Sequence, residues 1–380
     1  MRRHFRTVRS VPVPGRSILN PGQRSVLQRV QRFAPVWRGN GGRGWPSVFN
    51  VLCGGRKPAR ERQMTAMEER RMNDTRLAAR VIAEVKKVIV GKDEVLIKML
   101  LAILAGGHIL LEDIPGVGKT TMALAFSRAL GLRYGRVQFT PDVMPSDLTG
   151  FSMVNRATGQ LEYQPGALLC NLFLADELNR ATSRTQSALL EAMEEGQVTV
   201  DGVSHPIPQP FLVIATQNPT GASGTQLLPD SQLDRFMLRL TIGYPRPADE
   251  LELLRRRQQG GEPGNVRQVI SHAELSELRT AVDHIFIAED LLDYIVRLVG
   301  ATRSHPRILQ GASPRAALAL ASASRATAFL HGRDYAVPED IRSIFPDAIA
   351  HRLIPVAGGP SESSEAVKEI LNLVEAPKIR

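Results

Sequence analysis

The sequence predicts an α/β domain, in which helices flank a parallel sheet, followed by an all-α domain. Apolar runs at residues 109–111 and 172–175 each lead through a polar turn into a helix-forming stretch, and a third run covers residues 211–216. That alternation is typical of parallel strands joined by helices. Two closely spaced prolines in Tyr244-Pro-Arg-Pro247 then end strand and helix alike, and the pattern beyond them is helical.

Length and charge limit the classes of function. A chain of 380 residues exceeds the usual size of a single core, which favours two domains. The net charge is +10, but residues 1–60 hold 13 of the 48 Lys and Arg and none of the 38 Asp and Glu, so residues 61–380 carry 35 basic and 38 acidic groups. Because the body of the chain is mildly acidic, the main electrostatic argument for nucleic acid binding is absent.

Cysteine and histidine usage argues against other kinds of site. Cys53 and Cys170 are too few for a disulfide framework or a zinc site. The histidines show no ligand-type spacing, so we expect no protein-bound transition metal. The longest apolar run, residues 95–105, is interrupted by Lys98 and is too short to span a bilayer. We therefore expect a cytoplasmic protein with no integral membrane segment.

Residues 1–63 are rich in Arg, Gly and Pro and show no sustained helical or strand period. They could be a disordered basic arm that binds nucleic acid or membrane, or an organelle transit peptide. A third interpretation is translated sequence upstream of a true start at Met64, Met67 or Met72. We favour the third, because the ordered pattern begins after Asn73-Asp74.

The first ordered elements lead to a phosphate-binding loop. Helices are predicted at residues 75–90 and 94–105. A buried strand at 109–111, a glycine-containing loop at 113–118 and a helix over 119–130 follow in the order that such a loop requires. Unpaired N–H groups and the helix dipole make the start of that helix an anion site.

Individual residues of this loop have separate roles. Gly116 and Gly118 let the backbone approach phosphates closely, Lys119 reaches the β- and γ-phosphates, and the Thr120 hydroxyl can ligate Mg²⁺. The usual motif begins with glycine where this chain has Asp113. A glycine-rich turn without a nucleotide is the alternative, which the context disfavours. The sequence predicts that ATP or GTP binds at Pro115, Gly116, Val117, Gly118, Lys119, Thr120 and Thr121.

Two adjacent carboxylates end the next core strand. A short strand at 137–139 and an insertion-like segment at 141–168, with strands at 151–155 and 160–163, come first. Leu172–Ala175 then leads into Asp176 and Glu177. Asp176 can hold Mg²⁺, usually through water, and Glu177 can polarise the attacking water. The alternative is that both acids cap the following helix.

Polar residues also follow the third core strand. A helix at 185–195 precedes Asp201-Gly202, a strong hairpin signal between alternating Val and Thr residues. The strand 211–216 then ends at Gln217-Asn218-Pro219. Asn218 could orient water or touch a γ-phosphate, although such a residue more often belongs to a turn. Residues 237–241 form the last predicted strand.

The second domain contains helices at 248–259, 271–285, 288–302, 313–330 and 338–354. Ser313 is the expected N-cap of the fourth, with Pro314 in its first turn. Arg315 therefore lies where its cation opposes the helix dipole, which hints at an anionic partner. A solvent-exposed arginine is the commoner explanation of this pattern in isolation.

Together these motifs resemble a MoxR-type AAA+ ATPase over residues 75–355. The matching segments are Glu112-Asp-Ile-Pro-Gly-Val-Gly-Lys-Thr120, Leu174-Ala-Asp-Glu-Leu-Asn-Arg180, Gln186–Thr199, Ala215-Thr-Gln-Asn-Pro219, Gln232-Leu-Asp-Arg-Phe236 and Gly311-Ala-Ser-Pro-Arg-Ala316. Each segment alone is a weak to moderate signal, and their order and spacing make a strong one. The resemblance implies a P-loop AAA+ core over residues 64–244 and an all-α lid over 245–380.

The resemblance also implies a site and a set of partners. Asn218 would be the first sensor, Arg235 the arginine finger that reaches the neighbouring subunit's γ-phosphate, and Arg315 the second sensor. Val90 and Gly91 would lie by the adenine. Segments 148–165 and 196–207 would face the central pore of a hexameric ring. Such proteins hydrolyse ATP with Mg²⁺ and resemble chaperone-like factors that act with von Willebrand A-domain proteins to mature targets or insert metals.

Two other functions stay open at this point. A nucleic-acid motor or transcription activator could use the same core, but the hairpin at 197–205 holds no Lys or Arg with which to grip phosphates. A nucleotide-gated scaffold would bind ATP as a switch and hardly turn it over.

Overall fold

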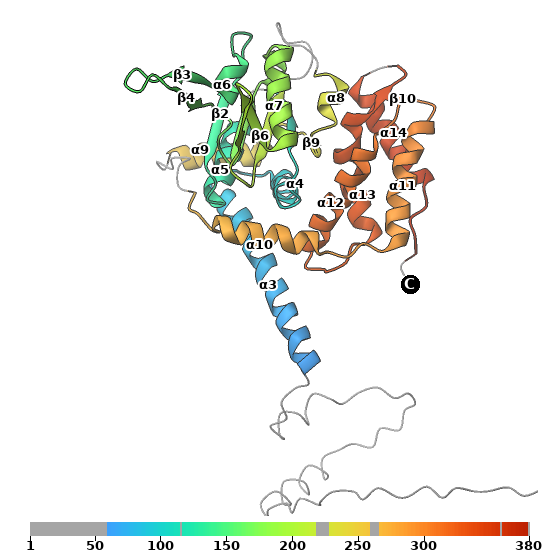
Figure 1. Cartoon of the computed structure of the whole chain (residues 1–380). Coiled ribbons are helices and arrows are strands. Elements are labelled where there is room, and N and C mark those ends of the chain that lie inside the picture. The colour runs from blue at the N-terminus through green and yellow to red at the C-terminus, as the bar shows by residue number, and fades with distance from the viewer. Residues whose placement is uncertain (1–58, 115, 218–227, 259–265, 358, 379–380) are drawn as a thin grey trace, which may run out of the picture. The chain divides into compact units, whose positions relative to one another are not determined.

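Figure 1 shows the computed structural model of the chain, which describes residues 59–114, 116–217, 228–258, 266–357 and 359–378. The chain divides into two units, Met1–Arg62 and Gln63–Arg380. All of the sheet and all of the helices from α4 onward belong to the second unit.

A five-stranded parallel sheet forms the centre of the second unit. Its spatial order is β2-β5-β8-β1-β9, and every neighbouring pair is parallel. The carboxyl ends of these strands therefore meet at one edge, the usual place for a ligand in an α/β sheet. The strands are β1 (Ile109–Glu112), β2 (Tyr134–Gln138), β5 (Leu172–Asp176), β8 (Leu212–Gln217) and β9 (Leu238–Leu240).

Helices and two antiparallel hairpins surround this sheet. The β3–β4 hairpin projects away from the body of the unit (Figure 1). The helices are α3 (Ala59–Val85), α4 (Asp93–Leu104), α5 (Lys119–Ala129), α6 (Pro145–Thr149), η1 (Leu178–Arg180), α7 (Ser183–Glu195) and α8 (Asp230–Leu233). The hairpins are β3 (Gly150–Val154) with β4 (Leu161–Pro165) and β6 (Gln197–Val200) with β7 (Val203–Pro206).

Beyond β9 the described chain is mostly helical, but it is not helical throughout. β10 and β11 form a small antiparallel pair, and α14 is an additional helix. Pairing between segments so far apart in the chain depends on tertiary contacts, which local spacing does not encode. The elements that follow β9, which we call the lid, are α9 (Pro247–Gln258), α10 (His272–Asp283), α11 (Glu289–Ser304), β10 (Ile308–Gln310), α12 (Pro314–Leu330), α13 (Pro338–Ile349), η2 (Ala350–Arg352), β11 (Ile354–Pro355) and α14 (Pro360–Leu373).

The first helix differs from its prediction at both ends. Residues 75–90 were expected to be helical, whereas α3 begins at Ala59 and ends at Val85. Its sequence before residue 75 consists largely of Ala, Arg, Glu, Gln and Met, which are good helix formers even without an apolar stripe. The helix therefore continues through Asn73-Asp74, after which the sequence pattern predicts the first ordered element.

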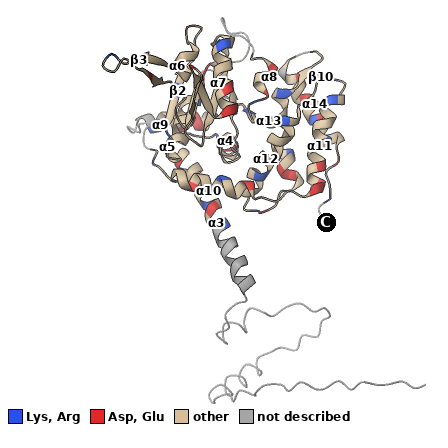
Figure 2. Ribbon diagram, viewed as in Figure 1, with Lys and Arg blue, Asp and Glu red and all other residues tan. Residues whose placement is uncertain are grey.

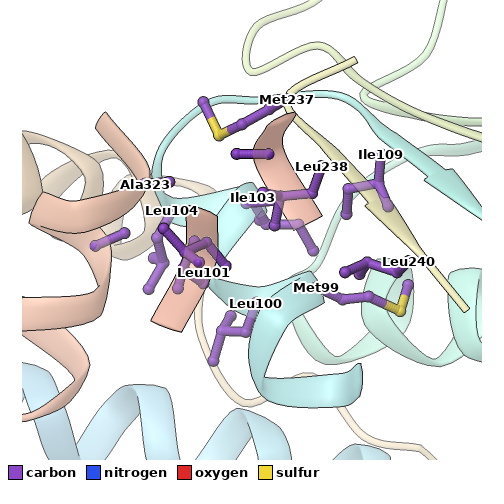
Figure 3. Packing of buried hydrophobic residues seen from close by; sticks show 14 of the residues in the cluster. Met99, Leu100, Leu101, Ile103, Leu104, Ile109, Met237, Leu238, Leu240 and Ala323 are labelled. Carbon is purple, nitrogen blue, oxygen red and sulfur yellow. The ribbon is translucent and has the colours of Figure 1, made fainter. Parts of the chain in front are cut away.

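One apolar core joins the sheet to the lid. Met99 and Leu104 of α4 pack near Ile109 of β1, Leu238 of β9 and Ala323 of α12 (Figure 3). All five belong to one cluster of buried residues. Because α12 shares this core with β1 and β9, the buried side chains hold the lid against the sheet.

Charged residues are spread over both parts of the unit. Figure 2 shows separate patches of Lys and Arg and of Asp and Glu both on helices around the sheet and on helices of the lid. In the described part of the chain, no helix combines the length and the apolar character that crossing a membrane requires.

His108, immediately before β1, is held in its neutral form. The Val213 N–H donates to its Nδ1 at 3.0 Å, so Nε2 carries the proton and faces the Met193 carbonyl at 3.2 Å. Burial lowers the pKa of His108 to about 4. The folded protein thus binds fewer protons than the unfolded chain between about pH 4 and the ordinary His pKa of about 6.5.

We expect the free energy of unfolding to fall by up to about 2 kcal/mol through His108 alone between pH 7.5 and pH 5. The sign follows because the unfolded imidazole gains its proton first as the pH falls. Urea unfolding of the wild type and His108→Gln at both pH values measures the difference. His331→Gln, which removes an exposed histidine that lies 3.6 Å from Asp340, controls for the loss of one histidine. An unchanged pH dependence in His108→Gln would contradict this assignment.

Candidate functional site

The phosphate-binding loop presents open backbone at the start of α5. Gly116 and Gly118 have φ values of 85° and 94°, which favour glycine. A Cβ added at either position would meet nothing within 4 Å, so the space above the loop is clear. Gly118 occupies the N-cap position of α5 with no side-chain cap, which leaves the first N–H groups of the helix available to an anion.

Lys119 lies beneath this loop and is only 7% exposed. Its ammonium donates to the Asp113 carbonyl and, at 3.4 Å, to the Gln217 carbonyl. Burial lowers the pKa of Lys119, and the carboxylates of Asp113, Asp176, Glu177 and Glu112 oppose that shift. A cation held among carboxylates and carbonyls is ready to exchange these partners for phosphate oxygens.

Asp176 is held by three side chains at the end of β5. Its Oδ1 accepts from the Thr216 hydroxyl at 2.7 Å, and its Oδ2 accepts from Arg136 at 2.8 Å. The Thr120 hydroxyl lies 3.5 Å from the same Oδ2. Hydroxyl and carboxylate oxygens are the donors that Mg²⁺ prefers, so Thr120 and Asp176 fit that ion. The guanidinium of Arg136 already places positive charge at this oxygen.

Glu177 adopts a left-handed backbone conformation, with φ of 57° and ψ of 46°. This is an uncommon conformation for a residue other than glycine, and such outliers gather at functional sites. The Thr216 hydroxyl accepts the Glu177 N–H at 2.8 Å, while Arg180 lies 2.9 Å from the carboxylate. Glu177 makes no side-chain cap to η1, so its contacts do not support the capping alternative.

A cavity of about 400 Å³ opens beside the loop. Its size is within the range of small-molecule sites. Gly116, Val117 and Gly118 line one part of it, and residues 88–90 with Tyr244 and Pro245 line another. Val90 thus lies in the wall of this cavity, and its predicted place beside an adenine stays a prediction. Gly91 lines an adjoining cavity, and a Cβ there would lie 2.1 Å from the Asp249 carboxylate.

Arg235 and Arg315 belong to a second cluster, built around Glu194 at the end of α7. Arg235 lies 3.2 Å from one carboxylate oxygen of Glu194, and Arg315 lies 2.5 Å from the other. In the structure the anionic group beside Arg315 is the Glu194 carboxylate. One carboxylate holds two guanidinium groups, one from the end of α8 and one from the first turn of α12.

Asp234 fastens the lid to the core next to this cluster. Its carboxylate accepts from Ser313 at 2.9 Å and pairs with the largely buried Arg352 at 2.7 Å. Burial lowers the pKa of Arg352, an effect that Asp234 opposes and the nearby Arg315 reinforces. Ser313 occupies the N-cap position of α12 but does not cap it, because its hydroxyl donates to Asp234 instead. Ser313 is thus the N-cap residue of α12, as predicted, although its side chain does not cap the helix.

The structure brings the predicted loop and carboxylate residues to one place. Lys119, Thr120, Asp176 and Glu177 meet at the carboxyl edge of β1 and β5, with Val117 and Thr121 on the cavity side. Pro115 and Asn218 lie outside the described residues.

Three residues that contact candidate site residues were not predicted. Thr216 and Arg136 contact Asp176, and Glu194 contacts Arg235 and Arg315. Thr216 gives the only usable sequence signal, a hydroxyl residue within an apolar strand. Within the described residues, no group of three or more His, Cys, Asp or Glu side chains could hold a metal ion by itself. Mg²⁺ at Thr120 and Asp176 would therefore also need phosphate oxygens as ligands.

Comparison with known proteins agrees with this architecture. The family "ATPase family associated with various cellular activities (AAA)" matches residues 108–238, and "AAA lid domain" matches residues 300–372. A structure from Cytophaga hutchinsonii, described as a "putative ATPase", superposes with a TM-score of 0.77 at 38% identity and covers 83% of this chain and 99% of its own. The fold and the site thus define an AAA+ core with its lid.

Two curated relatives narrow the assignment. "Chaperone MoxR1" of Mycobacterium tuberculosis is 40% identical over 284 residues, which are 72% of this chain and 75% of that protein. "Uncharacterized protein YeaC" of Bacillus subtilis is 43% identical over 304 residues, 79% of this chain and 95% of that protein. The chain belongs to the MoxR family of AAA+ ATPases.

Proposed function

We propose that this protein hydrolyses ATP with Mg²⁺ in a ring whose active sites are shared between subunits. The observation that supports this most is the meeting of Lys119, Thr120, Asp176 and Glu177 beside an open glycine loop and a cavity of about 400 Å³. We assign the nucleotide-binding domain to residues 64–244 and the lid to residues 245–380.

In this proposal each residue acts on a different part of the reaction. Lys119 binds the β- and γ-phosphates, and Glu177 takes a proton from the attacking water, which Asn218 orients. Thr120 and Asp176 hold Mg²⁺, which neutralises charge on the phosphates when bound. Thr216 fixes both Asp176 and the Glu177 backbone, so that the two carboxylates keep their relative position.

The arginine cluster supports a site completed by a second copy of the chain. Arg235 and Arg315 are held together by Glu194, which is 31% exposed at its side chain, so an incoming phosphate can compete for both guanidiniums. In the proposed hexamer, Arg235 is the finger for the neighbour's γ-phosphate and Arg315 is the second sensor.

For the biological role we propose a chaperone-like remodelling or metal-insertion factor that acts in the cytoplasm with a von Willebrand A-domain partner. The name of the relative "Chaperone MoxR1" supports the first part. The β3–β4 hairpin exposes Phe151, Met153 and Leu161, apolar side chains that suit a protein client better than a phosphate backbone. This favours a protein target over a nucleic-acid motor.

The test is the ATPase rate of the full chain against protein concentration, with mass measured with and without ATP. We expect the rate per subunit to rise with concentration as an ATP-dependent hexamer forms, because an isolated subunit lacks the neighbour's arginine. A rate per subunit that stays flat in a monomer would exclude shared sites and leave an ordinary P-loop ATPase. A chain that binds ATP and assembles without turnover would favour the nucleotide-gated scaffold.

A further inference from the structure

Asp113 replaces the usual first glycine of the loop, and its carboxylate accepts hydrogen bonds from three backbone N–H groups. Its Oδ1 accepts from the Ile114 N–H at 2.8 Å, and its Oδ2 accepts from the N–H groups of Ile242 and Gly243. The residue is 6% exposed. The partners at 242 and 243 lie 129 and 130 residues further along the chain. The side chain therefore ties the phosphate-binding loop to a distant segment.

Lys92 holds the same segment from its other side. Its ammonium donates to the carbonyls of Ile242, Gly243 and Tyr244 at 2.8, 3.0 and 2.8 Å. The N–H groups of this segment thus face a carboxylate and its carbonyls face an ammonium. Each interaction is charge-assisted, and such hydrogen bonds are roughly twice as strong as neutral ones.

The segment 242–244 connects the last strand of the sheet, β9, to the first lid helix, α9. Tyr244 and Pro245 form one wall of the nucleotide cavity, and Lys92 lines it as well. The glycine loop that Asp113 begins lines another part of the cavity. Asp113 and Lys92 therefore both contact the segment that leads into the part of the lining at Tyr244 and Pro245.

We propose that Asp113 and Lys92 are positioning residues that fix the wall at Tyr244 and Pro245 relative to the phosphate-binding loop, so that base and phosphates bind together. This inference rests on the proposed nucleotide site. It implies that restoring the common glycine at position 113 weakens the site. Glycine keeps the backbone contacts of Asp113 with Lys119 and Gln217 but removes the tether to Ile242 and Gly243.

We expect Asp113→Gly to weaken ADP binding about tenfold and pyrophosphate binding less than about twofold, because pyrophosphate needs the loop alone. Titration calorimetry with ADP and with pyrophosphate on the full chain measures both. Asp113→Ala removes the carboxylate without the flexibility of glycine and should behave alike. Asp113→Asn, whose amide oxygen can still accept from two N–H groups, should lie between these variants and the wild type.

Lys92→Met tests the other side of the segment and should also weaken ADP more than pyrophosphate. Lys86→Met is the matched control, since the Lys86 ammonium pairs with the exposed Asp93, and it should bind both ligands as the wild type does. Hydrogen exchange gives a readout without ligand. The amides of Ile242 and Gly243 should exchange faster in Asp113→Gly and Asp113→Ala, while the central strands keep their protection.

Two results would overturn the inference while the proposed nucleotide site stands. One is tight ADP binding by Asp113→Gly with unchanged exchange at 242 and 243. The other is an equal loss of ADP and pyrophosphate, which would mean that Asp113 serves the loop alone. Wild-type protein that binds neither ligand would instead contradict the proposed function, and the exchange rates would still decide whether Asp113 holds the segment.

Discussion

Replacing Arg235 with alanine is expected to lower the ATPase rate of the assembled protein about 10³-fold, the lower end of what a trans arginine finger contributes. Arg235 lies at the end of α8, 3.2 Å from Glu194, with its side chain 26% exposed. Among the described residues its Nε is buried without a hydrogen-bond partner. A guanidinium held by one moderate ion pair, with a donor unused, can transfer to a phosphate at small cost.

The same substitution should leave ADP affinity and folding nearly unchanged. Loss of one partly exposed ion pair costs at most about 1 kcal/mol in the free energy of unfolding, and Arg315 still neutralises Glu194. Steady-state ATPase rates, ADP titration and urea unfolding separate these quantities. Arg297→Ala removes an exposed lid arginine that pairs with Asp293 and is the matched control. A wild-type rate in Arg235→Ala would remove this residue from the active site.

The candidate site could be predicted from the sequence where its residues are consecutive in the chain. The run from Ile109 to Thr121 contains its own strand, loop and helix start, and Asp176-Glu177 follow directly on an apolar strand. Such a motif can be recognised in the sequence because the backbone groups and side chains typical of a phosphate-binding loop are consecutive, so that no tertiary contact has to be known. Both segments lie at the carboxyl edge of the sheet, and the α/β fold class is confirmed.

Contacts between distant segments could not be predicted in this way. Asp113 was recognised as a departure from the usual loop pattern, but its partners at 242 and 243 follow only from the position of β9 beside β1. The pairing of Glu194 with Arg235 and Arg315 likewise depends on where α8 and the lid helix α12 lie relative to the end of α7. Hydrophobic periodicity specifies which face is buried but not which neighbour covers it.

Glu177→Gln should lower the ATPase rate by about 10²–10⁴, the usual contribution of a positioned general base. Glutamine has nearly the same shape and can still accept a hydrogen bond from Arg180, which lies 2.9 Å from the present carboxylate. The backbone bond from the Glu177 N–H to Thr216 does not involve the side chain. ATP should therefore bind to the variant with nearly wild-type affinity and stay bound. Glu195→Gln, at an exposed acid of α7, is the control.

Mixing the two inactive variants tests whether sites are shared. An Arg235→Ala subunit keeps Glu177 and its own loop, and a Glu177→Gln subunit keeps the arginine that the neighbour needs. At each interface where they meet in the right order, one complete site forms. Random assembly of an equal mixture makes such sites at about a quarter of the interfaces, so about a quarter of the wild-type rate should return. A mixture as inactive as either variant alone would mean that Arg235 acts within its own subunit or on another step. If sites are shared, the two variant subunits must restore activity at the interfaces where they form a complete site.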